Sequence, residues 1–152
     1  MATIRVGLDL DAPPPAAEAL WYDIQRWPSF VDGFGKLVKV EGEWPAVGSR
    51  VVWDSTPNGR GRVSERVVAH EPGAGSSTEV EDPRLRGTQR VMFESLEWGI
   101  GVGLELDYEL KQPGPFQRLA DLFFIRRALR DSLRRTLVRF QRELASDLEL
   151  LR

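Results

Sequence analysis

The sequence contains no cysteine and only one histidine, His70. Disulfide bonds and thiolate zinc sites are therefore excluded, and one imidazole cannot form a histidine-rich metal site. No apolar run approaches the roughly 20 residues of a membrane-spanning helix, and the first residues do not resemble a secretory signal. We therefore expect a cytoplasmic protein with no metal, no cofactor and no integral membrane association.

What is present is the composition of one globular domain. The chain has 152 residues, of which 41% are hydrophobic and 29% are charged, and it contains no internal repeat or long linker. This length is sufficient to bury a core without crosslinks. We expect residues 1–152 to form a single domain.

The net charge of -2 conceals an uneven distribution. Residues 1–115 contain 12 Lys and Arg and 18 Asp and Glu, so this part is acidic. Residues 116–152 contain 9 Lys and Arg and 5 Asp and Glu, so this part is basic. Because the arginines fall where an amphipathic helix needs polar residues, we expect them on its solvated face, with no nucleic acid partner. Weak contact of this face with an anionic surface is the alternative interpretation. The arginines are Arg126, Arg127, Arg130, Arg134, Arg135, Arg139 and Arg142.

The first third of the chain predicts a strand followed by two short helices. Ile4 and Val6 begin an alternation typical of a strand over residues 3–10. Three consecutive prolines at 13–15 suit a first helical turn, where the amides have no intrahelical partner. Pro28 interrupts the helix that follows, so a second short helical turn is expected after it.

Alternation and turn residues predict six more strands and a long C-terminal helix. The hairpin turn at Asn58-Gly59 is favoured because tight hairpins need positive φ. Residues 116–152 contain no proline or glycine and repeat apolar residues at threes and fours, with a break expected near residues 123–126. The predicted strands cover residues 35–44, 50–55, 62–70, 78–81, 88–95 and 98–111.

This order of elements resembles the helix-grip architecture of the START-like superfamily. Ala12-Pro13, Trp21, Trp27-Pro28 and Trp44-Pro45 are similar to the polyketide cyclase/dehydrase and lipid-transport group, often called SRPBCC. The resemblance implies an α+β fold with a curved antiparallel sheet of about seven strands around the long C-terminal helix. It also implies a cavity for a hydrophobic small molecule, such as a lipid or polyketide, and transfers no catalytic residue.

The hairpin at Asn58-Gly59 leaves two alternatives for the cavity wall. If residues whose numbers add to 117 pair, Val52 faces Glu65, and one face carries Glu65, Asp54 and Arg50. The other face carries Trp53 and His70, and alternation does not decide which face is inside. A buried carboxylate without a partner has a raised pKa and can act as a general acid or base.

Candidate site residues follow from these patterns. The sequence assigns no catalytic residue; if the protein is an enzyme, Glu65, Asp54 and Tyr108 are the candidates for proton transfer. The expected ligand contacts are Trp53, Glu65, Gln89, Phe93, Trp98, Leu104, Leu106, Tyr108, Phe123 and Leu129. A binding cavity of about 300–1,000 Å³ is expected between sheet and helix. Three functions stay open: binding of a hydrophobic molecule, polyketide cyclase or dehydratase chemistry, and an interaction module acting through the arginine face.

Overall fold

The computed structural model describes residues 1–112, 114–120 and 124–151 and contains one seven-stranded antiparallel sheet. The order across the sheet is β1-β7-β6-β5-β4-β3-β2, so only β1 lies away from its neighbours in sequence. The strands are β1 Ala2–Leu10, β2 Phe34–Glu41, β3 Arg50–Ser55, β4 Arg62–Glu71, β5 Gly75–Glu81, β6 Leu85–Ser95 and β7 Ile100–Leu110.

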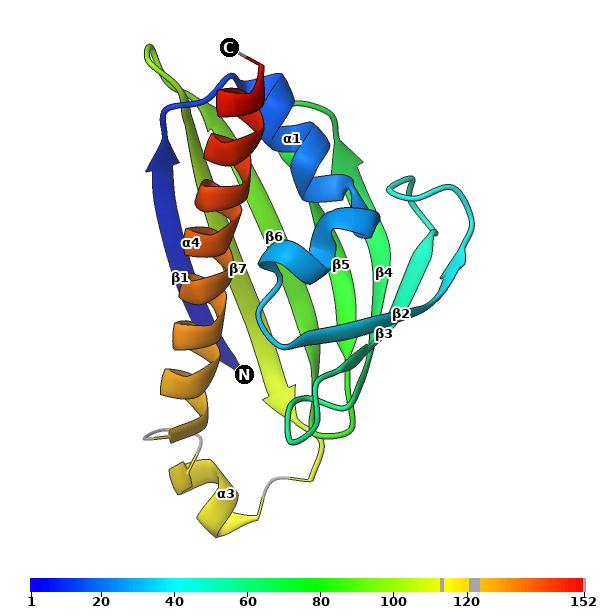
Figure 1. Ribbon diagram of the computed structural model, residues 1–152. Coiled ribbons are helices and arrows are strands. Elements are labelled where there is room, and N and C mark those ends of the chain that lie inside the picture. Colours follow the sequence, from blue (N-terminus) through cyan, green and yellow to red (C-terminus); the bar gives the residue numbers. More distant parts are fainter. Residues whose placement is uncertain (113, 121–123, 152) are drawn as a thin grey trace.

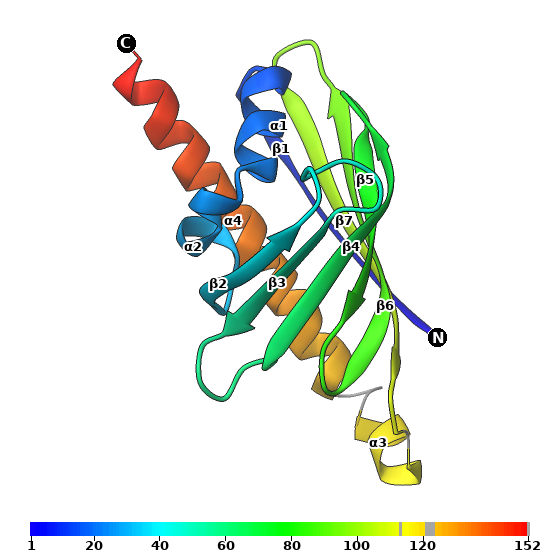
Figure 2. The same cartoon turned by 90° about the vertical axis from the view of Figure 1, so that its right-hand side faces the viewer.

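The helices α1, α2 and α4 lie on one face of this sheet. Figure 1 shows α4 running along β1 and β7, with α1 and α2 beside it, and Figure 2 shows the same layers from the side. This arrangement confirms the α+β helix-grip fold. The helical elements are α1 Pro14–Tyr22, the one-turn 3-10 helix η1 Ile24–Arg26, α2 Trp27–Phe30, α3 Pro115–Ala120 and α4 Arg126–Leu150. α4 begins at Arg126, and the break expected near residues 123–126 falls partly on residues 121–123, which lie outside the described residues.

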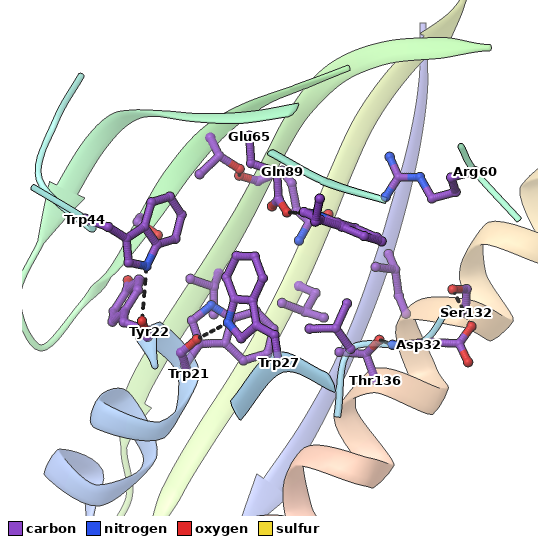
Figure 3. Close-up of a pocket in the computed structure, with 17 residues that line it drawn as sticks. Trp21, Tyr22, Trp27, Asp32, Trp44, Arg60, Glu65, Gln89, Ser132 and Thr136 are labelled. Carbon is purple, nitrogen blue, oxygen red and sulfur yellow. Dashed lines mark hydrogen bonds between the residues drawn. The ribbon is translucent and has the colours of Figure 1, made fainter. Parts of the chain in front are cut away.

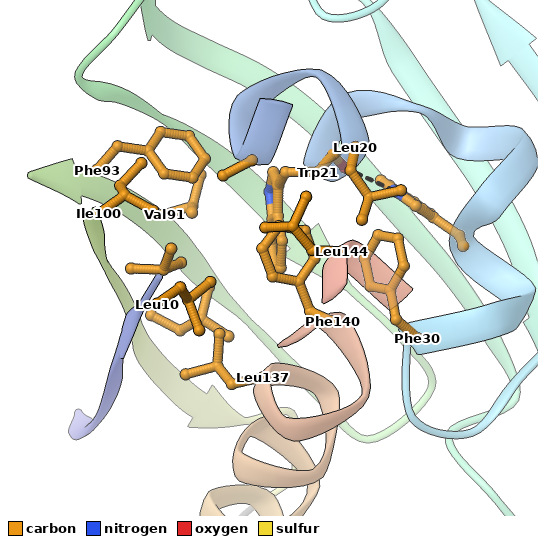
Figure 4. Packing of buried hydrophobic residues seen from close by; sticks show 14 of the residues in the cluster. Leu10, Leu20, Trp21, Phe30, Val91, Phe93, Ile100, Leu137, Phe140 and Leu144 are labelled. Carbon is orange, nitrogen blue, oxygen red and sulfur yellow. Dashed lines mark hydrogen bonds between the residues drawn. The ribbon is translucent and has the colours of Figure 1, made fainter. Parts of the chain in front are cut away.

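The core forms where the apolar stripe of α4 meets the short helices and β7. The Phe140 ring lies 5.4 Å from Trp21 and 5.2 Å from Phe30, measured between ring centroids (Figure 4). On β7 every second residue from Ile100 to Tyr108 is buried, as the alternation predicts. The sheet and α4 are therefore joined by a continuous apolar layer.

Polar contacts fix the segment after α2 against α4. The Asp32 carboxylate accepts hydrogen bonds from Ser132 Oγ at 2.7 Å and Arg135 Nη2 at 3.0 Å, and the Asp32 amide donates to Thr136 Oγ1. Burial raises the pKa of Asp32, but the hydrogen bonds from Arg135 and Ser132 and the charges of Arg135 and Arg139 together outweigh it and lower the pKa. Asp32 therefore stays ionised and ties this end of the cavity to the helix.

The register expected for the β3–β4 hairpin is wrong by one residue. Trp53 pairs with Val63 and Val51 pairs with Glu65. The connection is longer than a two-residue Asn-Gly turn, because Asp54 and Arg62 are the last paired residues. Within it Asn58 (φ 66°) and Gly61 (φ 87°) adopt positive φ. A one-residue slip exchanges the faces of a strand. Trp53 and Glu65, assigned to opposite faces by the sequence interpretation, consequently share the face toward the helices.

Candidate functional site

A cavity of about 70 Å³ lies between the inner face of the sheet and the helices α1, α2 and α4. The expected range of about 300–1,000 Å³ is too large, because four tryptophans project into this space. Figure 3 shows Glu65, Gln89 and Arg60 on the sheet side, and Asp32, Ser132 and Thr136 at the α4 side. A ligand larger than a few water molecules needs some of these side chains to move.

An aromatic wall encloses the cavity from the side of the short helices. Trp27 and Trp44 meet edge to face, with ring centroids 5.6 Å apart. Trp27 Nε1 donates to the Trp21 carbonyl at 2.9 Å, and Trp44 Nε1 donates to the Tyr22 carbonyl at 3.1 Å. Because the indole N–H groups are satisfied, these rings present fixed apolar surfaces to whatever occupies the cavity.

Two carboxyl groups line the cavity, Asp32 at the α4 side and Glu65 on the sheet side, and only the pKa of Glu65 is raised. Glu65 Oε2 accepts a hydrogen bond of 2.7 Å from Trp53 Nε1. Burial raises the pKa of the Glu65 carboxyl, while the Trp53 hydrogen bond and the charge of Arg60 oppose that shift. The side chain keeps some accessible surface because it faces the cavity. A carboxyl with a raised pKa can hold a proton for transfer or donate it to a ligand oxygen.

Arg60 supplies positive charge at the same end. Its Nε donates to Asp82 Oδ2 at 2.8 Å, and its guanidinium carbon lies 6.0 Å from the centroid of the Trp53 ring. The Nη2 atom is buried and finds no hydrogen-bond partner within the described ranges. A buried donor without a partner is costly, so this atom is a natural contact for a ligand oxygen.

Tyr22 adds a second polar position, on the side of α1. Burial raises the pKa of its hydroxyl, and the nearby Ser76 hydroxyl opposes that shift. The two hydroxyls nevertheless lack the geometry of a full hydrogen bond, and no other described residue bonds to the Tyr22 hydroxyl. The Tyr22 ring packs edge to face against His70, 5.1 Å between centroids. His70 itself does not line the cavity.

Four of the expected ligand contacts line the cavity, and most of the others lie elsewhere. Trp53, Glu65, Gln89 and Leu104 face it. Phe93 packs against the Tyr22 ring, while Leu106, Tyr108 and Leu129 belong to a second apolar cluster. Trp98 is 58% exposed in the turn before β7, so the expected strand 98–111 begins two residues too early. Phe123 lies outside the described residues.

Asp54 is not a cavity residue. The register places it on the outer face of the sheet, where its carboxylate accepts two hydrogen bonds from Arg62. Hydrogen bonding with Arg62 is the main cause of a lowered pKa for Asp54. Arg50, its expected neighbour inside the cavity, pairs with Glu41 on the same outer face. The pair of cavity carboxylates expected from the sequence is therefore reduced to Glu65 alone.

Several lining residues escaped the sequence interpretation. Arg60 and Asp32 come from loops, and Ser132 and Thr136 come from the polar edge of α4, where no periodicity marks a cavity wall. The aromatic wall could have been predicted. Trp21, Trp27 and Trp44 are among the residues on which the family resemblance rests, but none was predicted to contact a ligand. Their density within the first third of the chain is the feature that could have identified them.

Comparisons with known proteins give the same architecture. Residues 1–145 match the family model described as polyketide cyclase / dehydrase and lipid transport. TTHA0849 from Thermus thermophilus is 19% identical, with 96% of this chain and 99% of that chain covered and a TM-score of 0.76. The di-domain ARO/CYC StfQ from the steffimycin biosynthetic pathway is 17% identical, with 97% of this chain and 51% of that chain covered and a TM-score of 0.79.

A Thalictrum norcoclaurine synthase point mutant, in complex with a transition state analogue, is 11% identical. The match covers 96% of this chain and 95% of that chain, with a TM-score of 0.71. At these identities the likeness concerns the fold. A search of curated protein sequences finds no match. Among the described residues no helix is long and apolar enough to cross a membrane, and no group of acidic or histidine side chains could hold a metal ion.

Proposed function

We propose that this chain, which belongs to the polyketide cyclase / dehydrase and lipid transport family, binds a small, mainly apolar molecule in the cavity between sheet and α4. The observation that carries the proposal is Arg60, which lines a cavity with aromatic walls and whose buried Nη2 has no hydrogen-bond partner among the described residues. Ligand sites characteristically combine apolar walls with a few convergent polar groups.

The polar end defines the chemistry of the ligand. A carbonyl or hydroxyl oxygen would accept from Arg60 Nη2, and the Glu65 carboxyl would form a second hydrogen bond to the same head group. The apolar part would lie against Trp21, Trp27 and Trp44. Since the cavity measures only about 70 Å³, binding requires an outward shift of its wall.

Tryptophan fluorescence provides the test, because four of the five tryptophans line the cavity. We expect saturable changes in emission when the protein is titrated with decanoic acid, a lipid-like probe, or with dihydroxynaphthalene, a polyketide-like probe. Trp98 is exposed outside the cavity, so Trp98→Phe should remove background emission and leave the response intact. Saturation by neither probe would count against the proposal.

A pair of matched variants separates cavity binding from adsorption to the surface. Thr78 lines the cavity on β5, whereas Thr88 faces outward on β6, opposite Glu79. The ring introduced by Thr78→Phe should occupy the cavity and abolish the fluorescence response. Thr88→Phe should leave the response unchanged. Circular dichroism spectra of both variants establish that they are folded, and equal responses would place the probes outside the cavity.

The buried Glu65 carboxyl favours a second candidate function. In its ionised form the Glu65 carboxylate, made more basic by its raised pKa, would take a proton from a carbon next to a carbonyl and become the neutral carboxyl, while Arg60 stabilises the resulting enolate oxygen. This is the proton transfer that a cyclase or dehydratase acting on a polyketone requires. A loss of turnover in Glu65→Gln, with binding retained, would distinguish catalysis from binding alone.

A further inference from the structure

Among the described residues of the segment that joins β7 to α4, three large apolar side chains are exposed. Phe116 and Leu119 of α3 are 88% and 56% exposed, and Phe124 is 74% exposed. Figures 1 and 2 show α3 projecting beyond the end of the sheet. Single exposed apolar residues are ordinary on protein surfaces, whereas several large ones on one projecting segment mark an interaction site.

The first turns of α4 carry unpaired positive charge next to these side chains. Arg127, Arg130 and Arg134 are three and four residues apart, so they share one stripe of the helix. None of the three forms an ion pair within the described part of the chain. By contrast, Arg135 and Arg139 both pair with Asp32. The residues from 126 to 134 include four arginines and one aspartate.

We propose that α3 and the first turns of α4 dock the protein onto an anionic lipid surface. Phe116, Leu119 and Phe124 would enter the boundary between head groups and acyl chains, while Arg127 and Arg134 bind the lipid phosphates. Apolar side chains flanked by arginines are the combination that holds proteins at membrane interfaces. A second copy or a protein partner could cover the phenylalanines, but the adjacent unpaired arginines select a negatively charged surface.

The docking surface lies close to the cavity along α4. Ser132 and Leu133 line the cavity, and Ser132 lies six residues after Arg126, about 9 Å along the helix. Docking would therefore bring the α4 wall of the cavity near the bilayer. The lipid contact involves none of the cavity side chains, so vesicle binding and ligand binding can be tested independently of each other.

The test is flotation of the full chain with vesicles of phosphatidylcholine, with and without phosphatidylglycerol. We expect association with the anionic vesicles at low salt and weaker association at high salt. The double variant Phe116→Ser with Phe124→Ser should lower the partition coefficient roughly tenfold or more, because both rings lose apolar burial. Arg127→Glu should lower it about fivefold or more.

Two matched controls and one alternative outcome make the test decisive. Trp98→Ser removes an exposed aromatic ring at the opposite end of the sheet, and Arg142→Glu reverses an exposed charge farther along α4. Both should float like the unmodified protein. Absence of flotation, or flotation unaffected by loss of Phe116 and Phe124, would overturn the proposal. So would a dimer in light scattering that the double variant dissociates, without any vesicle binding.

Discussion

Replacing Phe140 by alanine is expected to lower the free energy of unfolding by about 3–5 kcal/mol. Phe140 is fully buried and contacts the rings of Trp21 and Phe30 at centroid distances of 5.4 and 5.2 Å. Its removal leaves a cavity and deletes two aromatic pairs, each of which contributes about 0.5–1.5 kcal/mol beyond its burial. Urea unfolding monitored by circular dichroism measures the loss.

The matched control for Phe140 is Phe124, which undergoes the same chemical change on the surface. Phe124 is 74% exposed, so Phe124→Ala should alter the free energy of unfolding by less than about 0.5 kcal/mol. Equal losses in the two variants would contradict the packing of α4 against α1 and α2.

Replacing Glu65 by glutamine is expected to remove a pH-dependent loss of stability. The folded protein holds the Glu65 proton to higher pH than the unfolded chain, because burial raises the pKa above its ordinary value of 4.5. The contribution of Glu65 to the free energy of unfolding of the wild type is therefore greatest below pH 4.5 and declines as the pH rises through the pKa of the folded state. Glu65→Gln cannot ionise, so its stability relative to wild type should increase across that range.

The same substitution has a larger effect if the cavity is catalytic. Glutamine keeps an oxygen to accept from Trp53 Nε1 but cannot exchange a proton, so turnover of a polyketone substrate should fall by about 10²–10⁴ while binding persists. Asp54→Asn is the control, because Asp54 lies on the outer face with Arg62.

The stability prediction has its own contradicting outcome. A pH profile of unfolding identical in wild type and Glu65→Gln would show that Glu65 is not held in a buried environment.

Strand periodicity predicted the fold well because the burial of one sheet face imposes it. The alternation in β7 identified the inner residues Leu104, Leu106 and Tyr108 correctly as buried. It did not separate the cavity from the solid core, since Leu104 lines the cavity while Leu106 and Tyr108 pack in the second cluster. Periodicity reports which face is buried, and says nothing about where along a strand a void remains.

The β3–β4 hairpin shows why the site was harder to predict than the fold. An Asn-Gly pair fits a two-residue turn, yet here Asn58 occupies a longer connection that also uses the positive φ of Gly61. The resulting shift of one residue joins Trp53 to Glu65 and sends Asp54 outward. Arg60 lies in that same connection, so no local pattern indicates that it turns toward the cavity.

The most direct test of ligand binding is native mass spectrometry of the chain purified from its own host, compared with Thr78→Phe prepared in the same way. We expect a stoichiometric small molecule on the wild type, released by denaturation as an apolar compound with an oxygen function. The folded Thr78→Phe variant should carry none. A wild type that is bare, or a compound retained equally by both proteins, would contradict the assignment of this cavity as the binding site.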